Sequence, residues 1–144
     1  MPEWVSTAYA DYVKRLPPDW QLTLCEIPLE KRTKQTDLSR VMQKEARKMC
    51  AAIPNGSFVV ALDCQGREQD SHQLANNIQR WRESHRDICF LIGGPEGFSP
   101  DCLARADYRC SLSALTLPHP FVRVLVAEQL FRSWSILNNH PYHR

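Results

Sequence analysis

Two uninterrupted apolar runs with a helical segment between them constrain the fold of this chain more than any other feature. The runs cover residues 57–63 and 87–92, and such continuous stretches are typical of parallel strands that helices cover on both faces. Residues 71–84 between them carry apolar side chains at helical spacing, with Asp70 or Ser71 available as the N-cap. This arrangement predicts a β-α-β unit of an α/β fold with a mostly parallel central sheet.

The amino-terminal part predicts two helices and one short strand. Residues 3–16 place apolar side chains at three- and four-residue intervals until a proline pair ends the pattern. Residues 21–27 alternate between apolar and polar, which favours a short strand. Thr36 is a plausible N-cap for a second helix, whose apolar stripe covers residues 38–53 and ends at the turn signal of residues 54–56.

The part that follows the second apolar run predicts another helix and strand and then a long final helix. Residues 100–104 indicate a short helix, and residues 112–117 indicate a strand. Pro120 suits the first turn of the final helix. The stripe that we expect this helix to bury is Phe121, Val124, Ala127, Phe131 and Trp134. A chain of 144 residues fits one domain, residues 1–144.

Composition limits the class of protein. The formal net charge is only +2, which by itself does not indicate a nucleic-acid partner. The six cysteines contain no C-x-x-C pair, a pattern typical of reduced structural thiols in the cytosol. No apolar stretch approaches the roughly 20 residues of a membrane span, and the first residues lack the layout of a signal peptide. We therefore expect a soluble, cytoplasmic protein that does not bind membranes.

Positive charge is concentrated in one quarter of the chain, and two interpretations of it stand side by side. Nucleic acid would contact such a surface, but a solvated helix face balanced by Glu30, Asp37 and Glu45 would have the same composition. The basic residues concerned are Lys31, Arg32, Lys34, Arg40, Lys44, Arg47 and Lys48.

Two segments predict a bound small molecule. Residues 91–97 (LIGGPEG) and residues 111–120 (SLSALTLPHP) each lead an apolar run into glycine or proline. Turns of this kind expose backbone N–H and C=O groups at the carboxyl end of a sheet, where α/β proteins place ligands. The GGPEG turn matches neither a phosphate loop nor a dinucleotide fingerprint, so taken alone it is also compatible with a structural turn.

The sequence gives little support for covalent catalysis or for metal binding. No G-x-S-x-G motif is present, and no cysteine has a neighbouring histidine, so covalent catalysis is not expected. His140 and His143 in the tail lack a third nearby ligand, so we expect no metal. His119 stands between two prolines, where a packing histidine and a functional one look alike.

The GGPEG turn, residues 111–136 (SLSALTLPHPFVRVLVAEQLFRSWSI) and the terminal NHPYHR together resemble the RlmH family very closely. This family comprises SPOUT-class methyltransferases that act on a pseudouridine of large-subunit (23S) ribosomal RNA. The resemblance extends over the whole chain, including MPEWV at the start, Lys31-Arg32 and the sequence ALD that ends the first apolar run.

The resemblance implies a SPOUT-type α/β fold with a deep trefoil knot in its carboxyl-terminal part, and S-adenosyl-L-methionine bound in that knot. It also implies a homodimer in which the last helix packs against its partner, with an RNA site that spans both subunits. Residues that the resemblance places at the cofactor are Leu62, Gly94, Ser113, Ala114, Leu115, Thr116, Leu117 and Pro118.

The resemblance locates the residues of methyl transfer, and their chemistry suggests roles for them. The N3 nitrogen of pseudouridine must lose a proton, for which His119 is a candidate acceptor. Arg132 and Arg144 are candidates for stabilising negative charge on the carbonyl oxygens. Glu128 would orient Arg132, and Tyr142 would stack on the base or form a hydrogen bond with it. The small net charge favours the assembled ribosome over free RNA as substrate.

The sequence departs from the family at its start. Family members begin with a short apolar strand ahead of the segment that matches MPEWV. Two explanations stand for its absence: a start codon assigned downstream of the true one, or a version that lacks this strand and exposes a sheet edge. Two alternatives to the main prediction remain: a knotted methyltransferase that acts on transfer RNA, and a ribosome-associated binding protein that has lost catalysis.

Overall fold

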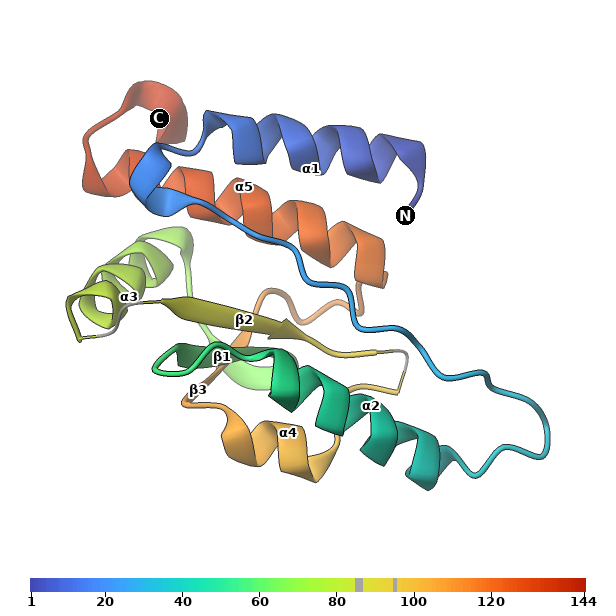
Figure 1. Cartoon of the computed structure of the whole chain (residues 1–144). Helices are drawn as coiled ribbons and strands as arrows, with labels where there is room; N and C mark the ends of the chain where they lie inside the picture. The colour runs from blue at the N-terminus through green and yellow to red at the C-terminus, as the bar shows by residue number, and fades with distance from the viewer. Residues whose placement is uncertain (85–86, 95) are drawn as a thin grey trace.

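The computed structural model describes residues 1–84, 87–94 and 96–144. Its centre is a three-stranded parallel sheet with the strand order β2-β1-β3 (Figure 1). The strands are β1 (Phe58–Glu68), β2 (Ile88–Ile92) and β3 (Tyr108–Ser111). The predicted α/β class and the mostly parallel sheet are confirmed.

The predicted β-α-β unit is confirmed at nearly the expected boundaries. Helix α3 (Ser71–Ser84) connects β1 to β2. The Asp70 side chain accepts a hydrogen bond from the backbone N–H of Gln73, and the Gln73 side chain accepts one from the N–H of Asp70, both at 2.8 Å. This reciprocal capping box satisfies donors that the start of a helix leaves free, so Asp70 is the N-cap.

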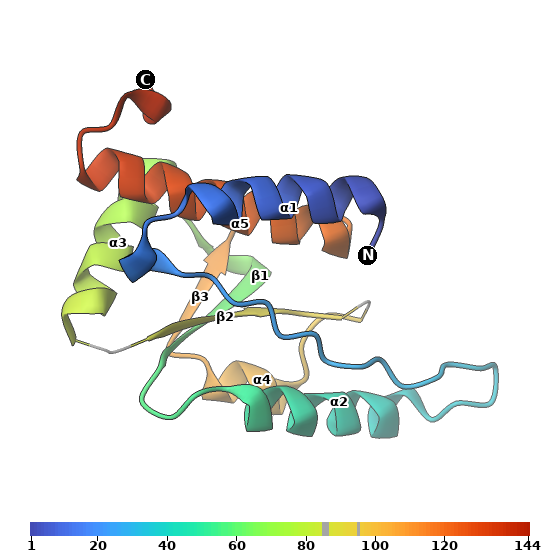
Figure 2. The ribbon, with the colours of Figure 1, turned by 45° about the horizontal axis from the view of Figure 1, so that its top comes forward.

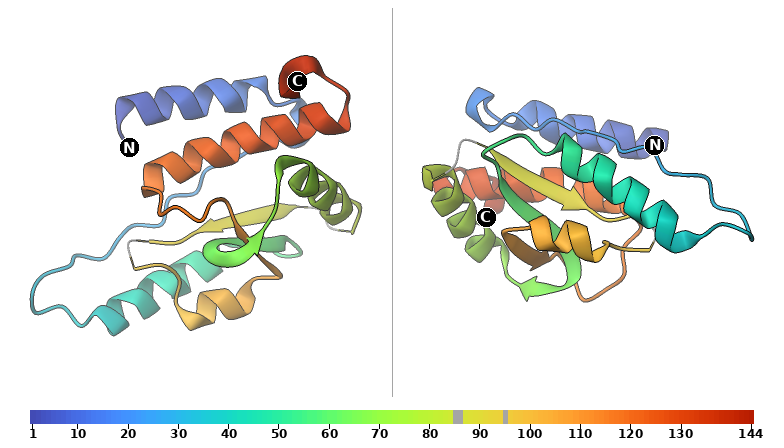
Figure 3. Two further views of the ribbon diagram at one scale, coloured as in Figure 1. Left: turned by 180° about the vertical axis from the view of Figure 1, so that it is seen from behind. Right: turned by 60° about the horizontal axis from the view of Figure 1, so that its bottom comes forward.

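Helices cover both faces of the sheet. Helices α3 and α5 (His119–Leu137) lie on one face, and α1 (Glu3–Arg15) runs alongside α5 as an outer layer (Figure 2). Helices α2 (Leu38–Ala52) and α4 (Pro100–Arg105) lie on the opposite face (Figure 3). Two 3-10 turns complete the structure, η1 (Pro18–Trp20) and η2 (Pro141–His143).

Alternate residues of β1 form two separate hydrophobic cores. Val60 packs with Leu74, Ile78 and Trp81 on the face of α3 and α5. Val59 packs with Ile53 and Leu91 on the face of α2 and α4, and neither valine is exposed to solvent. Because successive side chains of a strand point to opposite faces, a continuous apolar run is required wherever both faces are covered.

Two predicted strands are absent from the described structure. Residues 21–27 contain no strand, because none of the described strands supplies backbone partners for them. Residues 112–117 form a loop, and the strand precedes them at β3. The Ser111 hydroxyl donates to the carbonyl of Ser113 at 3.0 Å, and the Leu115 N–H donates to the Ser113 hydroxyl at 2.9 Å. These turn contacts compete with strand pairing and end β3.

Two finer predictions were also wrong. Asp37, not Thr36, caps α2, because the Asp37 side chain accepts from the N–H of Arg40 whereas the Thr36 hydroxyl binds the N–H of Thr33. The expected stripe on α5 is only partly buried: Ala127 and Phe131 are in the core, but Phe121 is 47% exposed. Helix α5 is covered from two sides, by α1 and by α3, so its apolar residues do not follow a single stripe.

Candidate active site

The carboxyl ends of the three strands meet at one edge of the sheet. Leu62 in β1 lies opposite Ile92 in β2 and opposite Cys110 in β3. Gly94 follows β2, and the loop of residues 112–118 follows β3, so the structure brings these predicted cofactor positions to the same edge. Strand order reverses at β1, which is where open α/β sheets form ligand crevices.

The glycine turn after β2 leaves open space at Gly94. Pro95 lies outside the described residues, but Gly97 donates its N–H to the carbonyl of Gly94 at 3.0 Å and has a φ of +80°. A Cβ on Gly93 would lie 3.1 Å from the carbonyl carbon of Gly97, so a side chain at this position would be tight against the turn. Among the described residues beyond its chain neighbours, a Cβ on Gly94 would contact only the Leu29 side chain, at 3.8 Å. A ligand therefore has room to approach Gly94.

The loop after β3 presents free backbone groups. Within the described part of the chain, the backbone N–H and C=O groups of Ala114, Thr116 and Leu117 form no hydrogen bond. Leu115 is 72% exposed, and Pro118 begins the connection into α5. A loop of this kind can bind a heterocycle through backbone hydrogen bonds and apolar side chains.

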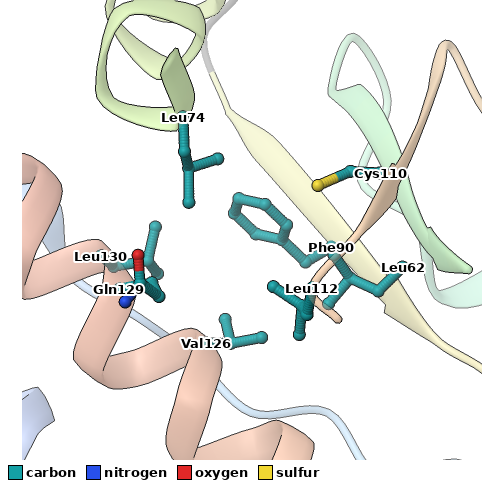
Figure 4. Close-up of a pocket in the computed structure, with 8 residues that line it drawn as sticks. All are labelled: Leu62, Leu74, Phe90, Cys110, Leu112, Val126, Gln129 and Leu130. Atoms are coloured by element: carbon teal, nitrogen blue, oxygen red, sulfur yellow. The ribbon is translucent and has the colours of Figure 1, made fainter. Parts of the chain in front are cut away.

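A small apolar cavity lies behind this edge. Figure 4 shows side chains of the sheet, α3 and α5 converging on it. Its volume of ≈ 10 Å³ is at most that of one water molecule, so a cofactor would lie at the open edge in front of it. The lining residues are Leu62, Leu74, Phe90, Cys110, Leu112, Val126, Gln129 and Leu130.

Three predicted catalytic residues form a polar cluster at the carboxyl-terminal half of α5. Arg132 Nε lies 2.8 Å from Glu128 Oε1, and its guanidinium lies 5.1 Å from the centre of the Tyr142 ring. The Tyr142 hydroxyl donates to Glu128 Oε1 at 3.4 Å and contacts the Tyr12 hydroxyl of α1 at 3.3 Å. Burial, followed by the hydrogen bond with Tyr12, raises the pKa of Tyr142 to about 12, so this phenol is a hydrogen-bond donor at neutral pH.

The carboxyl-terminal tail is anchored beside this cluster. The Ser135 hydroxyl lies 2.7 Å from His143 Nδ1, and the N–H of Tyr142 donates to His140 Nδ1 at 3.2 Å. Arg144 is exposed at the end of η2, and its N–H donates to the carbonyl of Pro141 at 3.0 Å. The two tail histidines thus fix the conformation of the chain that carries Tyr142 and Arg144.

His119 lies at the opposite end of α5, next to the loop of residues 112–118. It precedes Glu128 by nine positions of the helix, which corresponds to about 14 Å along the axis. A single chain therefore does not bring His119 to the cluster of Glu128, Arg132 and Tyr142. Its Nε2 is 3.5 Å from Arg123, which forms an ion pair of 2.8 Å with Glu26. Burial and then the Arg123 charge lower the pKa of His119, so its imidazole is neutral at pH 7.

Several residues of this region were not singled out from the sequence. Arg123 follows His119 by four positions, a spacing that places both on one helix face and could have indicated their contact. Glu26 and Tyr12 reach the site from segments about 100 or more positions away in the chain. No local pattern indicates contacts over such separations.

Acidic residues balance only part of the basic segment. Arg32 pairs with Glu45 and Glu96, and Lys48 pairs with Glu30, as expected for a balanced surface. The remaining members of the segment are exposed and form no ion pair with another described residue: Lys31, Lys34, Arg40, Lys44 and Arg47.

Two further properties concern metals and membranes. Among residues 1–84, 87–94 and 96–144, no group of three histidine, cysteine or acidic side chains is arranged to hold a metal ion. No helix in the same residues has the length and apolar character of a membrane span.

The fold and this edge define a class of protein, an α/β domain that exposes free backbone groups at the switch point of a parallel sheet. Comparison with known proteins is more specific. A family model described as "Predicted SPOUT methyltransferase" matches residues 1–143. The chain is also 49% identical over 144 residues to "Ribosomal RNA large subunit methyltransferase H" of Marinomonas sp. (strain MWYL1), a match that covers 100% of this chain and 93% of that protein. The chain therefore belongs to the SPOUT methyltransferase family, and its order of strands and helices is consistent with that fold.

Proposed function

We propose that this methyltransferase transfers a methyl group from S-adenosyl-L-methionine to N3 of a pseudouridine in 23S rRNA of the assembled ribosome. The observation that carries the proposal is the convergence of Leu62, Gly94 and the loop of residues 113–118 at one sheet edge. Family membership and the name of the Marinomonas relative support the reaction and the class of RNA.

The residues at this edge fit the proposed cofactor. S-adenosyl-L-methionine supplies an electrophilic methyl group on a sulfonium. The free backbone groups of Ala114, Thr116 and Leu117 suit the polar edge of its adenine. Leu62 and Leu115 suit the apolar ring faces. The open space at Gly94 would be filled by a side chain at that position and allows close approach to the backbone.

The substrate requires removal of a proton and stabilisation of the resulting charge. N3 of pseudouridine lies between two carbonyl groups and is protonated at neutral pH. The neutral imidazole of His119 can accept a proton, and the cations Arg132 and Arg144 can stabilise charge on the carbonyl oxygens. Glu128 holds Arg132 in position at 2.8 Å, and Tyr142 offers a ring for stacking and a hydroxyl donor.

The separation between the two ends of α5 supports a site formed by two subunits. Within one chain, His119 and the cofactor loop lie about 14 Å or more along the helix from Glu128 and Arg132. A second copy packed against α5 would bring the cluster of Glu128, Arg132 and Tyr142 of one subunit to the loop of residues 112–118 of the other. We therefore propose a homodimer, with the half-exposed aromatic pair Trp4 and Phe121 at its interface.

The ribosome as substrate is consistent with the modest charge of the surface. The exposed basic residues of α2 and of the loop before it can contact phosphates, but a net charge of +2 provides limited affinity for free RNA. Ribosomal surface would supply the remaining contacts, and we expect the protein in the cytoplasm, where ribosomes are.

The test is transfer of labelled methyl groups to ribosomes that lack this modification, with the product nucleoside identified by mass spectrometry. We expect N3-methylpseudouridine from ribosomes and much less from a short RNA hairpin. Arg144→Ala should abolish transfer and leave cofactor affinity nearly unchanged, because Arg144 would act on the base. No transfer by a folded, cofactor-binding protein would contradict the proposed substrate.

A matched pair of glycine variants tests the cofactor site separately. Gly94→Ala adds a methyl group at an ordinary contact distance from Leu29, so we expect a folded protein with weakened cofactor binding. Gly93→Ala places the same methyl group 3.1 Å from the backbone of Gly97 and should lower the free energy of unfolding. Calorimetric titration and urea unfolding separate the two effects; unchanged cofactor affinity in Gly94→Ala would remove Gly94 from the site.

A further inference from the structure

Arg32 uses all five N–H donors of its guanidinium. Nε and Nη2 donate to the two carboxylate oxygens of Glu96 at 2.6 and 2.8 Å. Nη2 and Nη1 donate to the two oxygens of Glu45 at 2.8 and 3.0 Å, and Nη1 also donates to the carbonyl of Glu30 at 2.8 Å. Two bidentate pairs on one guanidinium form a rigid planar junction, which lysine cannot reproduce.

This junction joins three segments that are distant in sequence. Arg32 belongs to the segment of residues 21–37, which runs from the α1 layer to the start of α2 (Figures 1 and 2). Glu45 lies on α2, and Glu96 lies in the glycine turn that contains Gly94. The three side chains are largely shielded, with 23%, 14% and 24% exposed for Arg32, Glu45 and Glu96. Hydrogen bonds from Arg32 lower the pKa of both carboxyl groups, so the junction is intact at neutral pH.

The same segment also places one side chain next to Gly94. The Leu29 side chain is the nearest group to the space beside Gly94, at 3.8 Å from the position of an added Cβ. Within the described residues, the turn itself has a single backbone hydrogen bond, from Gly97 to Gly94. The Arg32–Glu96 pair is therefore a strong polar tie between the described part of the turn and the segment before α2.

We propose that Arg32 is a positioning residue, which holds the glycine turn and Leu29 at the spacing from the loop of residues 113–118 that the cofactor requires. This inference rests on the proposed function, because it assumes that the cofactor binds between the turn and that loop. Arg32 touches neither cofactor nor substrate in this proposal; it acts through Glu96.

The chain offers a matched control for this junction. Lys48 forms an ion pair of 2.8 Å with Glu30, so it also ties the same segment to α2 but does not contact the glycine turn. Lys48→Ala therefore removes one tie of the segment and leaves the tie to Gly94 in place. Glu96→Gln preserves the size of the side chain and removes the charge that Arg32 binds.

The experiment measures the dissociation constant of S-adenosylhomocysteine by calorimetric titration, with thermal unfolding of each variant recorded in parallel. We expect Arg32→Ala and Glu96→Gln to weaken binding about tenfold or more, since each loses charge-assisted hydrogen bonds. Arg32→Lys should resemble Arg32→Ala, and Lys48→Ala should change binding by less than about twofold. Glu96→Gln provides the test if Arg32→Ala does not fold.

The outcomes separate this inference from the proposed function. A wild-type protein that binds no S-adenosylhomocysteine contradicts the proposed cofactor and the inference together. Wild-type binding with unchanged affinity in Arg32→Ala and Glu96→Gln contradicts the inference alone. Equal weakening by Lys48→Ala would also overturn it, because the effect would then arise from the segment in general and not from the glycine turn.

Discussion

Burial divides the six cysteines by reactivity. Cys25 and Cys64 are exposed, whereas Cys102 and Cys110 are buried, and burial raises the pKa of both buried thiols. Because the thiolate is the reactive form, we expect Cys25 and Cys64 to react first with a thiol reagent. Mass spectrometry after brief alkylation checks this, with a urea-unfolded sample as the control in which all sites react. Early labelling of Cys110 in the native protein would contradict the expected burial.

Burial and two neighbouring charges together determine the pKa of His119. Burial and Arg123 lower the pKa, and Glu26 opposes them. Arg123→Gln should therefore raise the pKa of His119, and Glu26→Gln should lower it further. Titration of the imidazole proton by nuclear magnetic resonance measures both changes. If the two variants shift the pKa in the same direction, the contact between His119 and Arg123 does not persist in solution.

At the scale of elements, β1 changes its register against β3 next to Gly66, where there is no room for a side chain. Leu62 and Arg67 both pair with Cys110, and the chain between them forms an irregularity. A Cβ on Gly66 would lie 2.7 Å from the backbone N of Cys110 and 2.8 Å from the carbonyl carbon of Arg109. Only glycine permits the two backbones to approach so closely.

Gly66→Ala should therefore destabilise the fold by on the order of 1–3 kcal/mol, the usual cost of overpacking. Urea unfolding measures the loss, and Gln65→Ala, at an exposed neighbouring position, is the control. A Gly66→Ala protein as stable as the wild type would show that β1 and β3 separate here without cost.

At the scale of the whole molecule, the exposed aromatic pair of α1 and α5 should mediate association. The Trp4 and Phe121 rings lie 5.3 Å apart, with 54% and 47% of these residues exposed. Phe121→Glu should shift the protein toward monomers in analytical ultracentrifugation, because it places a charge in an apolar contact. Leu38→Glu alters an equally exposed apolar residue at the start of α2 and should leave association unchanged. Dimers that persist in Phe121→Glu would place the interface elsewhere.

Secondary structure could be predicted wherever local pattern and tertiary environment agree. The run of residues 57–63 is apolar because helices cover both faces of β1, and α3 ends where its pattern ends. The prediction of strands failed where hydrogen-bond partners elsewhere in the chain decide whether a segment forms a strand. Residues 21–27 alternate like a strand but have no described strand to pair with, and serine side chains convert residues 112–117 into a loop.

By itself, the sequence determined the α/β class and the resemblance that indicates a family, because both depend on local periodicity and on motifs of contiguous residues. Only the tertiary structure decided which of these residues meet. It joined Glu128, Arg132 and Tyr142 in one cluster, kept His119 at the other end of α5, and placed Arg32 on Glu96 across 64 positions. Contacts over such distances arise from chain topology and packing, and no short-range pattern in a single sequence encodes them.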